Sequence, residues 1–149
     1  MRIVLQRVSR ASVTVDGAVT GSIGRGYVVL LGFGAEDGRL DFKSIEKMVD
    51  KIQKLRLFPD ENGKTNLSVN DIDDGGILVV SQFTLYADCR KGSRPSFENA
   101  ANPALAEKLY DYFIEYAKGR FKKTGHGIFG ASMEVELVNE GPFTVILQD

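Results

Sequence analysis

The sequence of 149 residues is long enough for one domain with a sizeable core, and its 43% hydrophobic and 26% charged residues are ordinary for a globular protein. A formal net charge of −1 argues against a protein that coats nucleic acid with a basic surface, but it permits a local basic patch. The single cysteine, Cys89, excludes an intrachain disulfide and favours a reducing compartment, so we expect a cytoplasmic protein. We expect no signal peptide, because the first seven residues become charged too early, and no membrane-spanning segment.

The first third of the chain predicts three strands. Loose alternation over residues 3–15 indicates a strand with a kink or bulge near Ser9-Arg10. Asp16-Gly17 is a strong two-residue hairpin signal, so residues 19–23 should return antiparallel. Residues 27–33 predict a third, well-buried strand.

The next segment predicts a helix over residues 41–55. Apolar residues recur there at three- and four-residue spacing and therefore share one face: Phe42, Ile45, Met48, Val49, Ile52 and Leu55. A loop is expected before it, over residues 34–38. A short strand at residues 56–58, a turn-rich loop and an irregular stretch over residues 66–74 should follow.

Residues 76–85 form the stretch around which the prediction is built. Ile77 to Val80 is apolar on both alternating faces, which indicates a central strand covered on both sides. If the strand continues, Gln82 and Thr84 lie on one face, and Ser81 and Phe83 lie on the other. Polar groups at the end of a buried strand either bond to neighbouring backbone or are left for a ligand, and both readings stay open here.

The second half of the chain predicts an exposed cationic loop, a helix and a C-terminal hairpin. Residues 89–97 contain glycine, proline and three cations. Asn102 and Pro103 are a good helix start and Gly119 a good helix end. Residues 133–138 and 143–147 should pair as the hairpin around a turn at residues 139–142. Overall we expect an α/β fold: a single domain, residues 1–149, with mixed β-sheet layers, barrel-like or in two sheets, and helices packed on one side.

Common catalytic chemistry is missing from the sequence. His126 is the only histidine and has no paired cysteine or carboxylate motif, so we expect no metal, no cofactor and no Ser-His-Asp triad. Phosphate-binding and dinucleotide-binding glycine motifs are also absent. An enzyme with so little acid–base machinery should act on a bond that is already reactive, such as an activated ester, through positioning and backbone donors.

Three separated stretches resemble the D-aminoacyl-tRNA deacylase family: residues 81–85 (SQFTL), 127–133 (GIFGASM) and 139–144 (NEGPFT). Residues 6–8, 11–15 and 94–97 are similar as well. The resemblance covers essentially the whole chain, and the motifs occur in order at matching spacing. It implies an editing hydrolase that cleaves the ester between a D-amino acid and the 3′ end of tRNA, and that removes glycine from alanine tRNA.

The resemblance also implies a homodimer in which Gly141 and Pro142, joined by a cis peptide bond, complete the site of the partner subunit. A chirality filter that is indifferent to the side chain has to bind what all amino acids share, and rigid backbone carbonyls can do so. We therefore hypothesise that these two carbonyls crowd an L side chain and leave room for D-amino acids and glycine. The alternative is an ordinary trans-proline turn.

The remaining site residues are assigned as expectations. Gln82, Phe83 and Thr84 should line the ester and terminal ribose, with backbone N–H groups as the oxyanion site, and Ser81 should hold the strand end. Thr84 could be read as a nucleophile, but no base is evident to activate it. The family is thought to use the 2′-hydroxyl of the terminal adenosine instead.

Further assignments concern substrate binding. Phe129 and Met133 should pack around the terminal adenine, or belong to the core. Arg7 should hold the Gly-Pro loop through backbone hydrogen bonds, or form a surface ion pair. The cations of residues 90–94 and 118–123 are candidate phosphate contacts for tRNA, or solvated surface.

Two other functions remain open from the sequence. One is a non-catalytic RNA-binding module that holds a 3′ end, which is weakened by the near-neutral charge and by the lack of a known RNA-binding signature. The other is an unrelated small-ester hydrolase that uses Thr84 or Cys89.

Overall fold

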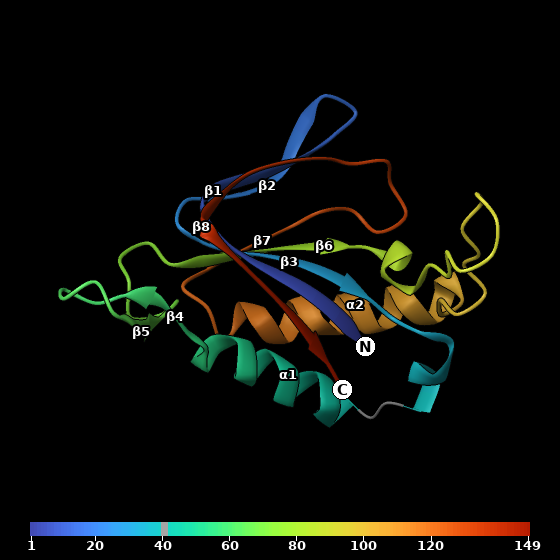
Figure 1. The fold of residues 1–149 in the computed structure, drawn as a ribbon, viewed down its shortest axis with the longest axis horizontal. Helices are drawn as coiled ribbons and strands as arrows, with labels where there is room; N and C mark the ends of the chain where they lie inside the picture. Colours follow the sequence, from blue (N-terminus) through green and yellow to red (C-terminus); the bar gives the residue numbers. More distant parts are fainter. Residues whose placement is uncertain (40–41) are drawn as a thin grey trace.

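The computed structural model describes residues 1–39 and 42–149 (Figure 1). The elements in chain order are β1 (Arg2–Val15), β2 (Ala18–Ile23), β3 (Gly26–Gly32), the 3₁₀ helix η1 (Ala35–Arg39), α1 (Phe42–Lys54), β4 (Arg56–Pro59), β5 (Thr65–Ser68), β6 (Gly76–Ser81), the 3₁₀ helix η2 (Phe83–Tyr86), α2 (Pro103–Lys118), β7 (Lys123–His126) and β8 (Glu134–Gln148). In this described part of the chain, one mixed sheet has the order β2-β1-β3-β6-β7, with β8 on β1, and β4 pairs with β5 separately.

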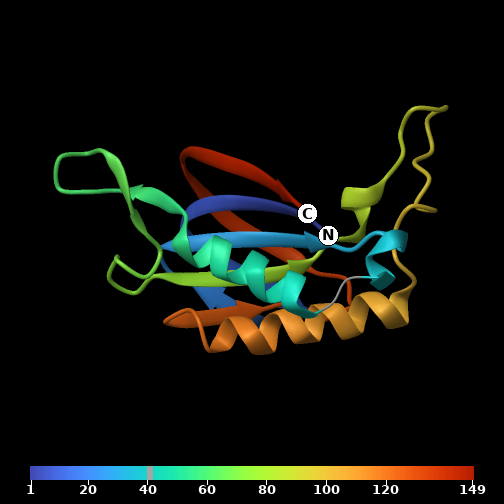
Figure 2. The same cartoon turned by 90° about the horizontal axis from the view of Figure 1, so that it is seen from below.

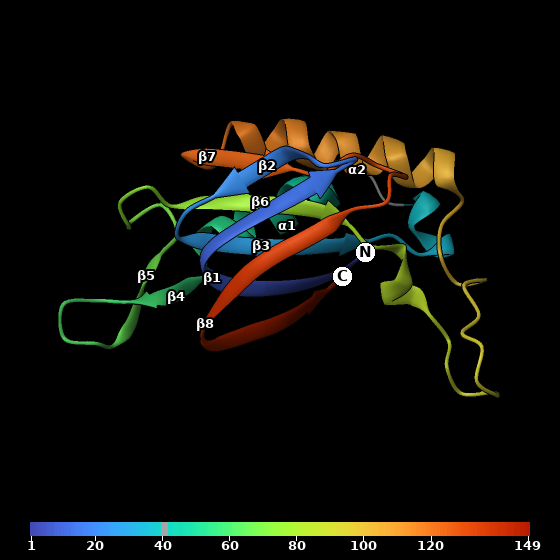
Figure 3. The ribbon, with the colours of Figure 1, turned by 90° about the horizontal axis from the view of Figure 1, so that it is seen from above.

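The sheet curls because β1, one of its two long strands, bends. The first half of β1 pairs with β3 and the second half with β2, while β8 pairs with β1 along both halves. The register with β8 shifts between Gln6 and Arg10, which confirms the kink expected near Ser9-Arg10. Figure 3 shows β1 and β8 bending together at the end of the molecule next to β4. The sheet is therefore barrel-like, which is one of the two forms expected from the sequence.

The central strands are buried on both faces, as predicted for residues 77–80. Tyr27 and Val29 of β3 and Ile77 and Val79 of β6 belong to the core between the sheet and the helices. The alternate residues of the same two strands, with partners from β1 and β2, fill the interior of the curled sheet: Val8, Ala11, Val13, Ile23, Val28, Leu78 and Val80. This two-sided burial accounts for the unbroken apolar run.

Both helices cover one side of the sheet (Figure 2), as expected. The stripe predicted for the first helix is confirmed at Ile45, Met48, Val49 and Ile52, while Asp41, its expected first residue, lies outside the described residues. None of the helices in the described residues is long and apolar enough to cross a membrane.

The helix α2 begins and ends where the sequence indicates. The side chain of Asn102 accepts a hydrogen bond from the N–H of Leu105 (3.0 Å), and Gly119 follows the last turn. The buried face of α2 consists of Ala106, Leu109, Tyr110, Phe113, Ile114 and Ala117.

Strand β6 ends at Ser81, so the condition for the alternation of Gln82 and Thr84 against Ser81 and Phe83 is not met. The N–H of Gln82 still donates to the carbonyl of Leu31 (2.8 Å), but the chain then folds into η2. Inside that turn, i→i+3 bonds replace the strand ladder. The stretch expected to be a loop before the first helix also contains a 3₁₀ helix, η1, and residues 65–68 form strand β5 against β4.

The C-terminal hairpin was also predicted wrongly. Residues 134–148 form one strand, and both of its arms pair with β1 instead of with each other. Gln6 pairs with Thr144 and Val8 with Asn139, so residues 140–143 bulge out opposite Arg7. The side chain of Asn139 closes the bulge by accepting a hydrogen bond from the N–H of Phe143 (2.8 Å). The turn signals at residues 139–142 therefore mark a bulge that follows the bend of β1.

Candidate active site at the end of strand β6

A cavity of about 440 Å³ opens at the carboxyl end of β6, between η2, the start of α2 and the segment that leads into β8. It is lined by Val80, Ser81, Gln82, Phe83, Ala101, Pro103, Ala106, Phe129, Gly130, Ala131, Met133 and Val135. Five residues expected at the site therefore meet around one space: Ser81, Gln82, Phe83, Phe129 and Met133. Ligand sites of α/β sheets commonly lie outside the carboxyl ends of parallel strands, and β3 and β6 are parallel here.

The turn η2 provides the polar edge of this cavity. Its first internal bond runs from the N–H of Leu85 to the carbonyl of Gln82 (3.2 Å), so the N–H groups of Phe83 and Thr84 come before it. No side chain caps the start of the turn. Thr84 is exposed beside the cavity and does not line it, and its hydroxyl is hydrogen-bonded to the side-chain amide of Gln82.

The opposite wall is fixed to β6 by two bonds to one carbonyl. The N–H of Gly127 and the hydroxyl of Tyr110 both donate to the carbonyl oxygen of Val79, each at a distance of 3.0 Å. Burial raises the pKa of Tyr110 well above its usual value, so this hydroxyl remains a donor at neutral pH. The ring of Phe129 lies 5.8 Å from the ring of Tyr110, centroid to centroid. Phe129 and Met133 are half-buried, so they pack against the core and also face the cavity.

Gly141 and Pro142 lie in the bulge of β8. Their peptide bond is cis, as expected, and both residues are exposed. Arg7 lies beneath them, with only 9% of its surface exposed. Its Nε donates to the carbonyl of Glu140 (3.1 Å), and its Nη1 donates to the carbonyl of Leu57. The backbone contact expected for Arg7 is thus present, in place of a surface ion pair.

Within one chain, the bulge and the cavity lie at opposite ends of the sheet. Arg7 pairs with Tyr27, which pairs with Ile77, whereas the expected site residues in the cavity begin at Ser81, four residues further along β6. Four residues of strand span about 13 Å, and the three strand-to-strand steps from β8 to β6 add about 14 Å sideways. The structure of a single chain therefore does not bring Gly141 and Pro142 to the other expected site residues.

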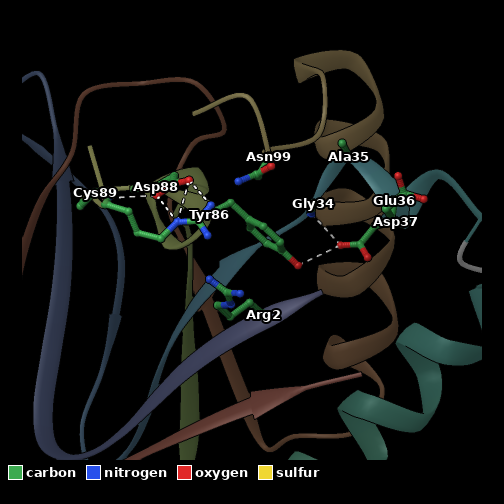
Figure 4. A pocket seen from close by; sticks show the side chains of 11 residues that line it. Arg2, Gly34, Ala35, Glu36, Asp37, Tyr86, Asp88, Cys89 and Asn99 are labelled. Atoms are coloured by element: carbon green, nitrogen blue, oxygen red, sulfur yellow. Dashed lines mark hydrogen bonds and ion pairs between the residues drawn. The ribbon is translucent and has the colours of Figure 1, made fainter. Parts of the chain in front are cut away.

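A second cavity, of about 740 Å³, lies on the other side of η2 and includes Arg2, Asp37, Tyr86 and Asp88 (Figure 4). Its carboxylates are already engaged. Asp37 accepts hydrogen bonds from the N–H of Gly34 (2.7 Å) and from the hydroxyl of Tyr86 (3.4 Å), and Asp88 binds the guanidinium of Arg90. Burial and the nearby Asp37 carboxylate raise the pKa of Tyr86 to about 12. Cys89 and Arg90 line this cavity, but none of the residues expected to hold the ester, the ribose or the adenine does, so the first cavity is the candidate active site.

Several lining residues could not be recognised from the sequence: Ala101, Pro103, Ala106, Gly130, Ala131 and Val135. Pro103 and Ala106 are three residues apart and share one face of the first turn of α2. Small side chains at that spacing leave room for a ligand, but the same residues also suit an ordinary helix start. Pro103 and Ala106 therefore indicate a ligand site only once the structure places the helix beside β6.

The cationic cluster of residues 118–123 is largely engaged within the chain. Lys118 pairs with Glu115 (2.5 Å), Arg120 with Asp50 (3.0 Å), and Lys122 donates to the carbonyl of Ile72 (2.9 Å). These contacts favour the reading of this cluster as structural surface.

The comparison with known protein families is decisive. The family model described as D-Tyr-tRNA(Tyr) deacylase matches residues 4–148. The chain belongs to this family. D-aminoacyl-tRNA deacylases from Koribacter versatilis and Clostridioides difficile are 52% and 53% identical to it, each over 147 residues that cover 99% of this chain and 96% of the relative.

Solved structures agree on the fold of this deacylase family member. The structure of c-Myc DNA Unwinding Element Binding Protein is 43% identical, with a TM-score of 0.89 over 100% of this chain and 99% of that one. A probable eukaryotic D-amino acid tRNA deacylase is only 18% identical but has a TM-score of 0.85 over 98% of this chain and 97% of that one. The second likeness shows the fold alone.

Proposed function

We propose that this chain is a D-aminoacyl-tRNA deacylase, an editing hydrolase that releases D-amino acids from tRNA in the cytoplasm. The observation that carries the proposal is the cavity at the end of β6, which Ser81, Gln82 and Phe83 line on one side and Phe129 and Met133 on the other. The family membership and the relatives' names support the same reaction.

The reaction in this proposal breaks the bond between the amino acid's carbonyl carbon and the 3′ oxygen of the terminal ribose. Water supplies the hydroxyl of the released acid, and the 3′ oxygen takes up the proton. The N–H groups of Phe83 and Thr84 stabilise the oxyanion that forms on the carbonyl, and the amide of Gln82 faces the ribose. The 2′-hydroxyl of the terminal adenosine assists the attack, and Phe129 and Met133 hold the adenine.

Selectivity for D-amino acids requires a second copy of the chain in this account. Gly141 and Pro142 lie about 13 Å along the strands from Ser81 in their own cavity, and both are exposed where a partner could meet them. In the described chain, β8 is paired on one edge only, and Ile146 on it is 66% exposed. A twofold homodimer would place the bulge of each subunit against the cavity of the other. The carbonyls of Gly141 and Pro142 then exclude an L side chain, and glycine passes because it has none.

The first test measures deacylation of D-tyrosyl-tRNA, L-tyrosyl-tRNA, glycyl-tRNA(Ala) and a simple ester, with a metal chelator present. We expect rapid hydrolysis of the D-tyrosyl and glycyl substrates, and little hydrolysis of the other two. Equal rates with both enantiomers would contradict the proposed filter, and hydrolysis of the simple ester alone would favour a general esterase.

The same assay separates the sources of the nucleophile. Thr84→Ala should retain most of the activity, because the Thr84 hydroxyl is bonded to Gln82 and lies outside the cavity lining. A D-tyrosyl-tRNA that ends in 2′-deoxyadenosine should be nearly inert. The reverse pair of results would assign the attack to the protein.

The alternative is a module that binds single-stranded nucleic acid without cleaving it. The neighbour of 43% identity is named for binding a DNA element, which gives this alternative its specific support. Binding of D-tyrosyl-tRNA with no release of D-tyrosine would establish it over the hydrolase.

A further inference from the structure

Two exposed aromatic side chains meet at the mouth of the candidate active site. Phe83 of η2 is 55% exposed and lines the cavity, and Phe97, from the segment before α2, is 40% exposed. Their rings meet edge to face with centroids 5.1 Å apart. Burial of a phenylalanine side chain normally stabilises a protein, so two adjacent exposed rings call for a function.

Phe97 is held in place by an arm, which we define as residues 88–99, and not by core packing. The arm's two sides are joined where Asp88 and Ser96 exchange both backbone hydrogen bonds (2.8 and 2.9 Å). The carbonyl of Asn99 at its base accepts from the N–H of Ala35 (2.9 Å). Figure 2 shows the segment between η2 and α2 extending away from the body of the molecule. Phe97 therefore sits at a fixed base beside the cavity, with the exposed tip beyond it.

The arm also carries positive charge. Arg90, Lys91 and Arg94 are exposed on it, and only Arg90 has an ion-pair partner within the described chain, Asp88 (2.5 Å). The arm thus combines aromatic faces with unpaired cations next to a cavity, in a chain whose net charge is −1. Proteins that bind single-stranded nucleic acid without sequence preference use this combination, because every base has a face to stack and every nucleotide has a phosphate.

We propose that Phe97, paired with Phe83, is a stacking platform for the nucleotides that precede the terminal adenosine of tRNA, and that Lys91 and Arg94 bind their phosphates. This inference rests on the proposed function, because it extends the path of the substrate outward from the cavity. The single-stranded 3′ end leaves the cavity over η2, and its next bases lie on the exposed aromatic pair. The platform contributes affinity for any tRNA and does not touch the ester.

The kinetic test compares two substrates that share the same ester. One is D-tyrosyl-tRNA, and the other is the D-tyrosyl ester of adenosine, which lacks the preceding nucleotides. Phe97→Ala should lower kcat/KM for the tRNA about tenfold, mainly by raising KM, since one base–aromatic stack is lost. Phe97→Ala should hydrolyse the adenosine ester at the same rate as the wild type. Phe97→Tyr should restore the rate with the tRNA.

Phe42→Ala is the matched control, because Phe42 is 39% exposed and stacks on Tyr112 in the helical layer, away from the cavity. It should change neither rate. An equal loss with both substrates in Phe97→Ala, or a loss with neither, would overturn the platform. If the wild type hydrolyses neither substrate, the proposed function fails instead.

A binding measurement reports on the platform without catalysis. The sequence contains no tryptophan, so Phe97→Trp and Phe42→Trp each introduce a single tryptophan, which can be excited at wavelengths where the five tyrosines do not absorb. Uncharged tRNA should quench the fluorescence of Phe97→Trp in a saturable way and leave that of Phe42→Trp unchanged. Replacing Lys91 and Arg94 by glutamine should make the plot of the logarithm of the binding constant against the logarithm of the salt concentration less steep. The magnitude of its slope should fall by about 0.7 for each cation removed. Equal quenching of the two variants, or no quenching of Phe97→Trp, would contradict the proposal.

Discussion

At the scale of single residues, Arg7 determines where the Gly141–Pro142 bulge sits. Its guanidinium joins the carbonyls of Glu140 and Leu57, and it lies against the ring of Phe143 at 5.1 Å. A Cβ on Gly141 would lie 2.9 Å from Nη2 of Arg7, and the φ of Gly141 is +127°, which L residues rarely adopt. The bulge therefore depends on a buried cation on one side and on the absence of a side chain on the other.

Removing this cation should cost stability. Arg7→Ala leaves the carbonyls of Leu57 and Glu140 without their donor, so we expect the free energy of unfolding to fall by about 3 kcal/mol. Arg7→Lys should recover only part of this, because an ammonium lacks the planar fork that reaches both carbonyls. Urea denaturation measures both values. Arg10→Ala, an exposed position on the same strand, is the control and should stay within about 0.5 kcal/mol of the wild type. A similar small change in Arg7→Ala would show that the bulge is held by other contacts.

At the scale of elements, the curled sheet closes where β2 approaches β7. A Cβ on Gly21 would lie 2.6 Å from the carbonyl oxygen of His126 and 3.1 Å from a methyl group of Leu78. The strands come this close because Gly21 has no side chain. This approach positions β7, and with it the start of the segment that forms the wall of the cavity.

We expect Gly21→Ala to lower the free energy of unfolding by about 2 kcal/mol, since backbone atoms have to move to accept the methyl group. Gly24→Ala is the matched control, because no atom lies within 4 Å of a Cβ there, and it should change stability by less than about 0.5 kcal/mol. Thermal and urea unfolding of the two variants test this directly. Equal effects at the two positions would mean that β2 and β7 do not need their close approach.

Local patterns predicted most elements but not the details that build the site. The two-sided strand β6, the capped helix α2 and the kink of β1 each have a period or a cap that can be read from neighbouring residues. The turn η2 has no such signature, because a 3₁₀ turn after a strand depends on which carbonyls are already occupied. The bulge of β8 looks like a hairpin in the sequence, because Asn139 to Pro142 are turn residues in either case. The difference lies in pairing with β1, which is more than 120 residues away in sequence.

At the scale of the whole molecule, the proposed homodimer divides the site between two copies of one chain. The cavity at the end of β6 would bind the ester and the adenosine, and the bulge of β8 would judge handedness in the partner's cavity. The two parts lie at opposite ends of the sheet in each subunit, so neither can work alone in this arrangement. A twofold axis makes the exchange reciprocal, and one dimer then contains two complete sites.

Mixing two inactive variants tests this division most directly. Gly141→Ala disturbs the bulge, Ala131→Phe fills the cavity, and each variant alone should lose at least about tenfold in D-tyrosyl-tRNA deacylation while keeping its dimeric state. After subunit exchange at equal concentrations, half of the dimers are mixed and each has one intact site, so the account predicts recovery of about a quarter of the wild-type rate. A mixture no more active than its components would show that bulge and cavity act within one chain, or not together at all, and would contradict the account.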